Sequence, residues 1–388
     1  MIGLQAREVA AETIPPVPPM HYHALDALRG IAALSVFFMH KVWLFNTHFN
    51  QVDVIHHFYL AVDFFFVLSG FVIATQYQQR LQEKKISISK FMLLRLGRIY
   101  PLHFAILMMY TAKILFFSGH KEFSVIAFVL NLFLVHSMGF TDIYSWNLPS
   151  WSISVEWWTY GLFALYAAFC LIRPRPLFLI TLAAALLLFI ACFGRDGMDV
   201  GALDYGLLRC IADFSIGTLL YHFWPQFQRT AAHLPANFLE IMVMIVMVGF
   251  ITLAYHQAWT VVAPFLFCVV VGVFALGRGA ISWVFCTRPF QELGKLSYSI
   301  YMNHYLFTTL LMDAFYQMAI RRHRFFDYIP TKYSSILGKT FWRGDALFAL
   351  TLAGLILVSY GTYYGIEKPC REWVRRKLAS SGGGCSPH

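Results

Sequence analysis

Two polar residues share one face of the first apolar segment of the chain. Arg29 and His40 stand eleven positions apart in LDALRGIAALSVFFMHKVWLF. Eleven steps of 100° along an α-helix return to within about 20° of the starting direction, with a rise of roughly 16 Å. Taken singly, each residue has an ordinary explanation, a snorkelling arginine and a buried core histidine. On a shared face they indicate a site with a phosphate ligand at one end and a general base at the other.

The second apolar segment carries one acid. Asp63 precedes Ser69-Gly70 by six residues in FYLAVDFFFVLSGFVIATQY. A carboxylate at this depth either orients a histidine or pairs with an arginine. The alternative is a packing role for the segment, in which Ser69-Gly70 lets a neighbouring helix approach closely.

A pair of arginines precedes the third apolar segment. Arg95 and Arg98 stand one helical turn apart in RLGRIYP, and Pro101 permits a bend after them. Two guanidiniums at this spacing suit a phosphate or a diphosphate. The competing explanation is ordinary anchoring by positive charge on the cytoplasmic side.

Further polar residues lie in two later segments. Ser152 and Glu156 stand one turn apart beside Trp151 in NLPSWSISVEWWTYG. An acid at the border of a membrane span needs a cationic or hydrogen-bonding partner, and Arg29 and His40 are the candidates. A second set comes from LGKLSYSIYMNHYLF, a helix polar enough to face the bundle interior: Ser297, Tyr298, Tyr301 and His304.

The composition of the chain is that of a membrane protein. Of its 388 residues, 59% are hydrophobic and 13% charged, against about 45–50% and 25% in soluble domains. The apolar residues form blocks of about 20, the length that spans a bilayer. This excludes a soluble enzyme, a secreted disulfide scaffold, a nucleic-acid-binding domain and a disordered tail. The net charge of +10 arises mostly in short loops.

The sequence predicts an all-α polytopic membrane protein with about ten transmembrane helices. An eleventh apolar block, 123–140, is short and interrupted by the polar residues Asn131 and His136, and we expect it to be re-entrant or tucked against the bundle. With both termini cytoplasmic, 17 Lys and Arg residues lie inside and 8 outside, as the positive-inside rule prefers. The expected spans are 24–45, 58–78, 99–117, 152–172, 177–193, 205–223, 238–256, 259–276, 296–316 and 346–366.

The expected organisation is a single membrane domain, 23–377, between a flexible cytoplasmic N-terminal tail, 1–22, and a C-terminal tail, 378–388. The seven cysteines have no CxxC spacing, so neither a metal cluster nor a disulfide framework is expected. His56-His57 lacks a third ligand at a recognised spacing, and we predict no metal site.

The chain resembles the acyltransferase 3 family of integral-membrane acyltransferases, which includes bacterial O-antigen and exopolysaccharide acetylases. The resemblance runs from about Tyr22 to Arg376. It is carried by six motifs in order: LDALRGIAALSVFFMH, DFFFVLSGF, RLGRIYP, PSWSISVEWW, LGKLSYSIYMNH and IEKPCREW.

The resemblance implies transfer of an acyl group, usually acetyl, from cytoplasmic acyl-CoA to a hydroxyl of a cell-surface or lipid-linked carbohydrate. It implies a catalytic centre containing His40 and Arg29. It implies that Arg95 and Arg98 contact the coenzyme, and that Glu156 with Ser152 serves the acceptor. It also implies a bacterial inner or plasma membrane location.

One departure concerns a second acid. Many relatives carry SVEEQFY where this chain has SVEWWTY, so Trp157 replaces an acid. The role of a second acid is therefore open, and the replacement allows a different acceptor.

The chemistry suits these residues. A sugar hydroxyl attacks a thioester poorly until a base takes its proton, and His40 is the expected base. The developing oxyanion needs a donor, for which Tyr298 or a backbone N–H is the candidate. We expect Asp63, Trp151 and His304 to support the site. The partners expected are acyl-CoA as donor substrate, the glycan acceptor and membrane lipids, with no tightly bound cofactor and no nucleic acid.

Two alternatives remain open at this stage. The acceptor could be a small hydrophobic metabolite such as a macrolide. In a different class, the buried charges could form the proton pathway of a transporter or flippase. No repeat at a fixed period supports the inverted-repeat architecture common among transporters.

Overall fold

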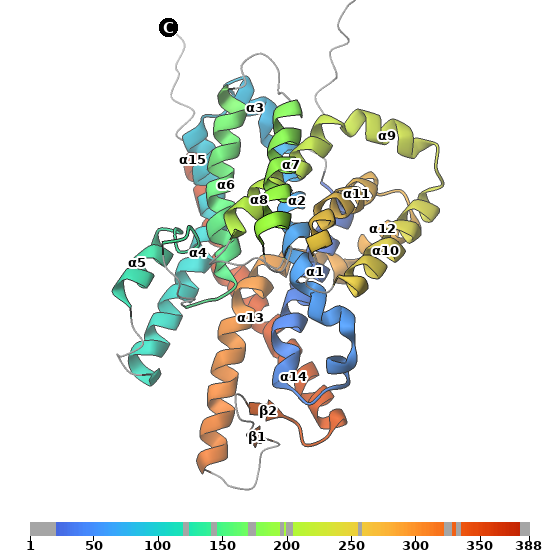
Figure 1. Cartoon of the computed structure of the whole chain (residues 1–388). Helices are drawn as coiled ribbons and strands as arrows, with labels where there is room; N and C mark the ends of the chain where they lie inside the picture. Colours follow the sequence, from blue (N-terminus) through green and yellow to red (C-terminus); the bar gives the residue numbers. More distant parts are fainter. Residues whose placement is uncertain are drawn as a thin grey trace, which may run out of the picture.

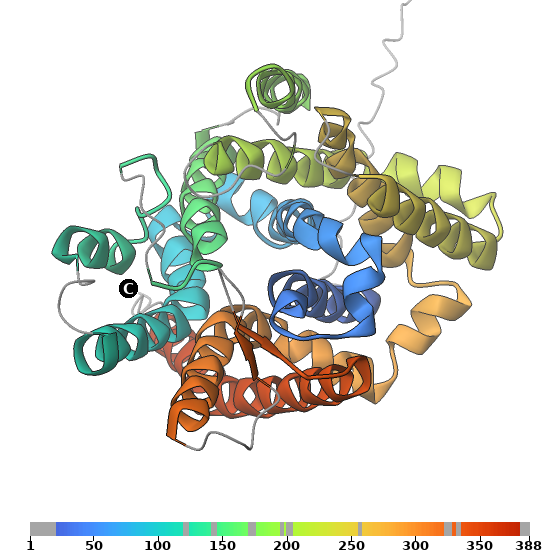
Figure 2. The same cartoon turned by 60° about the horizontal axis from the view of Figure 1, so that its bottom comes forward.

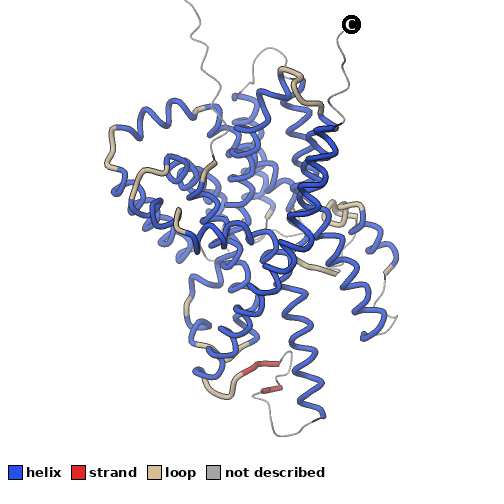
Figure 3. The backbone as a smooth tube through the Cα atoms, turned by 180° about the vertical axis from the view of Figure 1, so that it is seen from behind, coloured by secondary structure: helices blue, strands red, loops and turns tan. Residues whose placement is uncertain are grey.

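The structure is a computed structural model, and helix dominates it (Figure 3). It describes residues 21–118, 124–140, 146–169, 176–194, 198, 205–254, 258–321, 328–330 and 335–380. Most of the two expected tails, residues 1–20 and 381–388, lies outside the described residues.

Fifteen α-helices occur among the described residues. They are α1 His23–Lys41, α2 Ala61–Ile73, α3 Gln79–Gln82, α4 Ile88–Lys113, α5 Val125–Leu132, α6 Ser150–Phe169, α7 Pro176–Phe193, α8 Gly206–His222, α9 Trp224–Ala232, α10 Ala236–Leu253, α11 Ala263–Leu276, α12 Ala280–Phe285, α13 Arg288–Arg321, α14 Phe341–Thr362 and α15 Lys368–Ser380.

Shorter helical turns extend several of these helices. The 3₁₀ turns are Val42–Leu44, His48–Gln51, Asp53–Leu60 and Ala258–Val262, and the π turns are Ala74–Gln78, Ile114–Ser118 and Tyr363–Glu367.

Seven helical stretches in the described chain are long and apolar enough to cross a membrane. They contain α1, α2, α4, α7, α10, α11 and α14. The other three expected spans are also helical, as α6, α8 and α13. These three helices carry buried polar residues, such as Ser152, Arg209 and His304. Their composition is therefore that of interior helices in a membrane bundle.

The expected third span begins earlier than its apolar block. Helix α4 starts at Ile88, where the Ser87 side chain accepts a hydrogen bond from the Lys90 amide. It then continues through Pro101 to Lys113. The two arginines of RLGRIYP thus lie within a helix.

The short polar block 123–140 contains a single described helix, α5. Its eight residues rise about 12 Å at 1.5 Å per residue, less than half of a hydrocarbon core of roughly 30 Å. The helix itself is too short to cross.

Helices α1 and α2 occupy the middle of the bundle, and the others surround them (Figure 2). Helix α1 packs on α13, and α2 packs on α8. The α2–α8 contact depends on glycine: a Cβ on Gly70 would lie 2.1 Å from the Phe214 carbonyl oxygen, and one on Gly217 would lie 1.9 Å from that of Val67. The packing role considered for Ser69-Gly70 is therefore confirmed.

The two ends of the bundle differ. Helix α1 begins at the end where α15 lies, and it ends beside the strands β1 (Tyr328–Pro330) and β2 (Ser335–Leu337) (Figure 1). The strands pair antiparallel, and Phe45 forms a bridge to Leu337. We call these the α15 end and the hairpin end. The expectation of a purely helical chain misses this small sheet, whose strands have three residues each.

Candidate functional site

Two cavities lie in the centre of the bundle and share a wall. The arginine cavity is lined by Arg29, Arg95 and Arg98, together with residues of α2, α6 and α13. The histidine cavity is lined by His40 together with residues of 146–151, α8 and α13. Val62 and Tyr301 line both.

Helix α1 connects the two cavities. Arg29 lies in its first half and His40 is its penultimate residue. Because α1 runs from the α15 end towards the hairpin end, the arginine cavity is displaced towards the former and the histidine cavity towards the latter (Figure 1).

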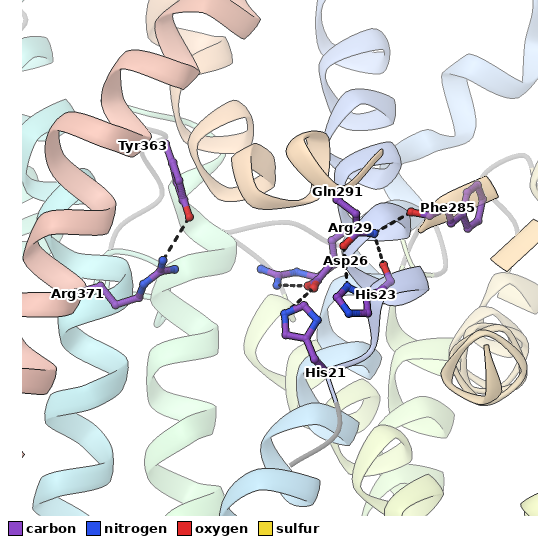
Figure 4. Close-up of polar contacts among 8 residues, drawn as sticks. All are labelled: His21, His23, Asp26, Arg29, Phe285, Gln291, Tyr363 and Arg371. Carbon is purple, nitrogen blue, oxygen red and sulfur yellow. Dashed lines mark hydrogen bonds and ion pairs between the residues drawn. The ribbon is translucent and has the colours of Figure 1, made fainter. Parts of the chain in front are cut away.

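Some N–H donors of the arginines in the first cavity have no hydrogen-bond partner among the described residues. Arg95 donates from Nη2 to the Tyr77 hydroxyl at 3.2 Å, while its buried Nε has no partner among the described residues. Arg98 forms no hydrogen bond or ion pair with the described residues. Arg29 reaches Asp26 at 3.5 Å, and Figure 4 shows Arg29 and His21 converging on that carboxylate.

Glu156 lies with these arginines and away from His40. It lines the arginine cavity, and its Oε1 accepts hydrogen bonds from Ser69 Oγ and the Tyr160 hydroxyl, both at 2.6 Å. We expected Glu156 on the acceptor side near the outer face. The difference arises because Glu156 is seven residues into α6, which brings it level with the α4 arginines.

A second acid reaches the same region. Glu367 is 2% exposed and accepts a hydrogen bond from Ser299 Oγ at 2.9 Å. Arg371 donates to the Tyr363 hydroxyl at 3.3 Å (Figure 4), and it lies 3.7 Å from the Glu367 carboxylate. Glu367 belongs to the IEKPCREW motif, and no role was predicted for it from the sequence.

The histidine cavity has a volume of about 530 Å³. Five aromatic residues contribute to its wall: Tyr59, Trp146, Trp151, Tyr301 and Tyr305. Aromatic rings combine broad apolar faces with polar edges. Such a wall suits a sugar ring, which presents C–H groups on its faces and hydroxyls around its rim.

His40 is hydrogen bonded to a second histidine. Its Nδ1 lies 3.1 Å from His304 Nε2, and the two rings are stacked 5.2 Å apart. His304 is fully buried, and its Nδ1 lies 2.6 Å from the Tyr301 carbonyl oxygen.

The contact between His304 and the Tyr301 carbonyl oxygen determines which ring nitrogens of His304 and His40 carry protons. Because a carbonyl only accepts, His304 must carry its proton on Nδ1, which leaves Nε2 with a lone pair. His40 must then donate from Nδ1 to that lone pair. The remaining nitrogen of His40, Nε2, is left as an acceptor, as a general base requires.

Tyr301 stands where the two cavities meet. Its hydroxyl lies 2.7 Å from Ser152 Oγ and 3.1 Å from the Pro149 carbonyl oxygen. Ser152 lines the arginine cavity, and Trp151, one residue earlier, lines the histidine cavity. The start of α6 and the middle of α13 thus form the partition, a role that the sequence analysis did not give to Tyr301.

Asp63 pairs with an arginine, one of the two roles expected for it. Arg209 on α8 contacts its carboxylate at 2.6 Å and 2.7 Å, and also donates to the Tyr59 carbonyl oxygen at 3.1 Å. The Arg209 guanidinium lies 5.7 Å from the Trp151 ring. The sequence analysis missed Arg209, although an arginine inside an apolar span was the available signal.

Tyr298, one of the two candidates for the oxyanion donor, lies away from His40. It lines the arginine cavity, and its hydroxyl donates to the Ile99 carbonyl oxygen at 2.5 Å. Its proton is therefore engaged by the backbone of α4.

No group of three or more His, Cys, Asp or Glu side chains in the described part of the chain could hold a metal ion.

Comparison of the whole sequence with known families gives a match. Residues 22–360 match the model of the acyltransferase domain family. The chain belongs to this family. Seven helical stretches of its described part are long and apolar enough to span a membrane.

Its curated relatives include bacterial O-acetyltransferases. The peptidoglycan O-acetyltransferase OatA of Listeria monocytogenes is 25% identical over 74% of this chain and 49% of its own length. A putative membrane-bound transacylase, BcsY of Komagataeibacter xylinus, is 25% identical over 72% of this chain and 71% of its own.

A third relative matches a shorter stretch of the chain at higher identity. Protein 2 in the picA locus of Rhizobium radiobacter is 40% identical over 86 residues, which cover 42% of that relative. The chain spans about half the length of the curated relatives it matches first. No solved structure matches significantly.

Proposed function

We propose that this protein is an O-acyltransferase that moves an acyl group, most simply acetyl, from cytoplasmic acyl-CoA to a hydroxyl of a cell-surface or lipid-linked carbohydrate. The observation that supports it best is the pair of adjoining cavities. One contains three arginines, the other contains a histidine with a free nitrogen, and both border Tyr301.

The arginine cavity is proposed to bind the coenzyme. Arg29, Arg95 and Arg98 would contact its phosphates, with the unpartnered Nε of Arg95 as one donor. Charge-assisted hydrogen bonds to phosphate are among the strongest a protein makes. The pantetheine arm would then extend along α1 towards Tyr301, bringing the thioester to the partition. Glu156 and Glu367 would offset part of the positive charge of Arg29 and Arg98.

The histidine cavity is proposed to bind the acceptor. A sugar stacked on Trp146 or Trp151 would present a hydroxyl to His40 Nε2. As the hydroxyl oxygen bonds to the thioester carbon, His40 takes the hydroxyl proton. The carbon–sulfur bond then breaks, and the proton passes to the departing thiolate, so that the products are the ester and free coenzyme.

The same proposal includes an orientation. The α15 end would face the cytoplasm and the hairpin end the opposite side, with both termini inside and ten crossings. The excess of Lys and Arg in the loops of the α15 end supports this. A bacterial inner or plasma membrane is the proposed location.

The relatives support a glycan acceptor. The Listeria relative is a peptidoglycan O-acetyltransferase. For this chain, the aromatic wall of the histidine cavity is the corresponding local feature.

Two linked measurements test the proposal. Purified protein should transfer label from acetyl-CoA to glycan fragments, and surface glycans from cells lacking the gene should lack an O-acyl group seen by mass spectrometry in the parent. Intact protein that neither binds acyl-CoA nor transfers label would refute it.

A further inference from the structure

The residue after His40 is a buried lysine without an anionic partner among the described residues. Lys41 is 5% exposed. Its ammonium lies 3.7 Å from the centre of the Tyr305 ring. It makes no hydrogen bond or ion pair with any described residue. The described carboxylate nearest to it in sequence belongs to Asp53, an exposed residue.

A buried cation in this state is costly. Removing an ammonium from water costs several kcal/mol, and a lone aromatic face returns only part of that. Buried lysines are therefore normally paired. The described chain supplies no anion for Lys41, so an anionic ligand would be its partner.

Lys41 contacts a residue of the histidine cavity wall. Tyr305, whose ring it covers, lines that cavity with His40 on the neighbouring helix α1. The Tyr305 ring also meets the His40 ring edge-on at 6.5 Å. An anion bound in the cavity on the Tyr305 side would therefore lie close to both the ammonium and the catalytic imidazole.

The cavity itself favours negative charge. Among the described residues that line it there is a guanidinium, Arg209, and no carboxylate. Arg209 is already neutralised by Asp63, with Asp213 beside that carboxylate. The charge left over at this site is that of Lys41.

From these observations we propose that the acceptor is anionic: a carbohydrate that carries a carboxylate or phosphate near its reactive hydroxyl, held by Lys41. The proposal rests on the function proposed above and specifies its acceptor. We assign the charge to the glycan itself, and the phosphate of a lipid carrier is the second source of the same chemistry.

Binding measurements separate the acceptor from the donor. Purified protein is titrated with trigalacturonate, with its neutral methyl ester, and with farnesyl diphosphate as a carrier-type phosphate. Wild type, Lys41→Met and Lys41→Arg are compared, and acyl-CoA affinity is measured on the same samples.

The expected result is that wild type binds trigalacturonate about tenfold or more tightly than the ester, the size of one charge-assisted contact. Lys41→Met removes the difference, and Lys41→Arg retains most of it. Acyl-CoA affinity stays unchanged in all three, which shows that the variants are folded.

Three outcomes would overturn the proposal. They are equal binding of acid and ester, failure to bind either while acyl-CoA binds normally, and an unaltered preference in Lys41→Met. Preference for farnesyl diphosphate over trigalacturonate would overturn the assignment to the glycan. Failure of the wild-type protein to bind acyl-CoA would instead count against the proposed function.

Discussion

His304 Nε2 lies 3.1 Å from His40 Nδ1, and His304 is anchored in turn to the Tyr301 carbonyl oxygen. This chain of contacts holds the His40 ring in one tautomer. In the proposed reaction it also spreads the positive charge that forms when His40 takes a proton.

The first prediction follows from that contact. His304→Ala removes the group that fixes the His40 tautomer, and kcat should fall about 10- to 100-fold, part of the 10²–10⁴ assigned to a general base. Acyl-CoA affinity should stay the same. His304→Gln keeps a side-chain carbonyl that accepts from His40, so it should restore part of kcat. A loss in kcat accompanied by equal loss of coenzyme binding, unrelieved by glutamine, would make His304 structural.

The second prediction concerns His40 itself. His40→Ala should lower transfer per folded molecule by about 10²–10⁴ and leave acyl-CoA binding intact. The matched control is His103, a buried histidine that donates to the Asn131 carbonyl oxygen outside both cavities. His103→Ala should reduce folded yield and spare the rate per molecule. Near-normal turnover in His40→Ala would show that another group is the base.

The third prediction concerns the arginine cavity. Arg95→Ala and Arg98→Ala should each weaken acyl-CoA binding about tenfold or more, the value of a charge-assisted hydrogen bond. Lys85→Ala is the control, because Lys85 is exposed and contacts Glu83 at the surface. Binding by isothermal titration in detergent provides the measurement. Equal affinities in all three variants would mean that Arg95 and Arg98 only anchor the chain by positive charge at the cytoplasmic side.

The fourth prediction concerns orientation. In a background without native cysteines, Lys84→Cys at the α15 end should be protected from an impermeant thiol reagent in whole cells. Lys339→Cys at the hairpin end should react. Reversal of the two results would invert the proposed topology and place the arginine cavity outside.

The fifth prediction concerns stability. Arg209→Met leaves the buried Asp63 carboxylate unpaired and should cost about 3–5 kcal/mol of folding free energy. The double variant Asp63→Leu, Arg209→Met should recover much of that loss, because it removes both charges. Thermal unfolding in detergent tests the order. A double variant as unstable as the single would show that the pair does more than balance charge.

The periodicity of α1 predicts that Arg29 and His40 share a helix face, because both lie on a single helix whose geometry is fixed, and they line two adjoining cavities. The position of Glu156 depended on how far α6 is sunk relative to α4, and packing between helices sets that depth. The choice between Tyr298 and a backbone N–H as oxyanion donor stayed open for the same reason: the Tyr298 helix faces inward as expected, but its hydroxyl meets the Ile99 carbonyl oxygen.

Partners on different helices were the hardest to predict. Asp63 was expected to find an arginine, yet several were available, and nothing in one sequence says that α2 packs on α8. The glycines at that contact, Gly70 and Gly217, become informative only when the two helices are seen together.

The Asp63–Arg209 pair also has a consequence for synthesis. The two residues are 146 positions apart. At 5–20 residues per second, a ribosome makes Arg209 on the order of 10 s after Asp63. During that interval α2 must wait with its carboxylate in water, at the membrane surface or inside the insertion channel. The contact between α2 and α8 therefore forms only after α8 has emerged.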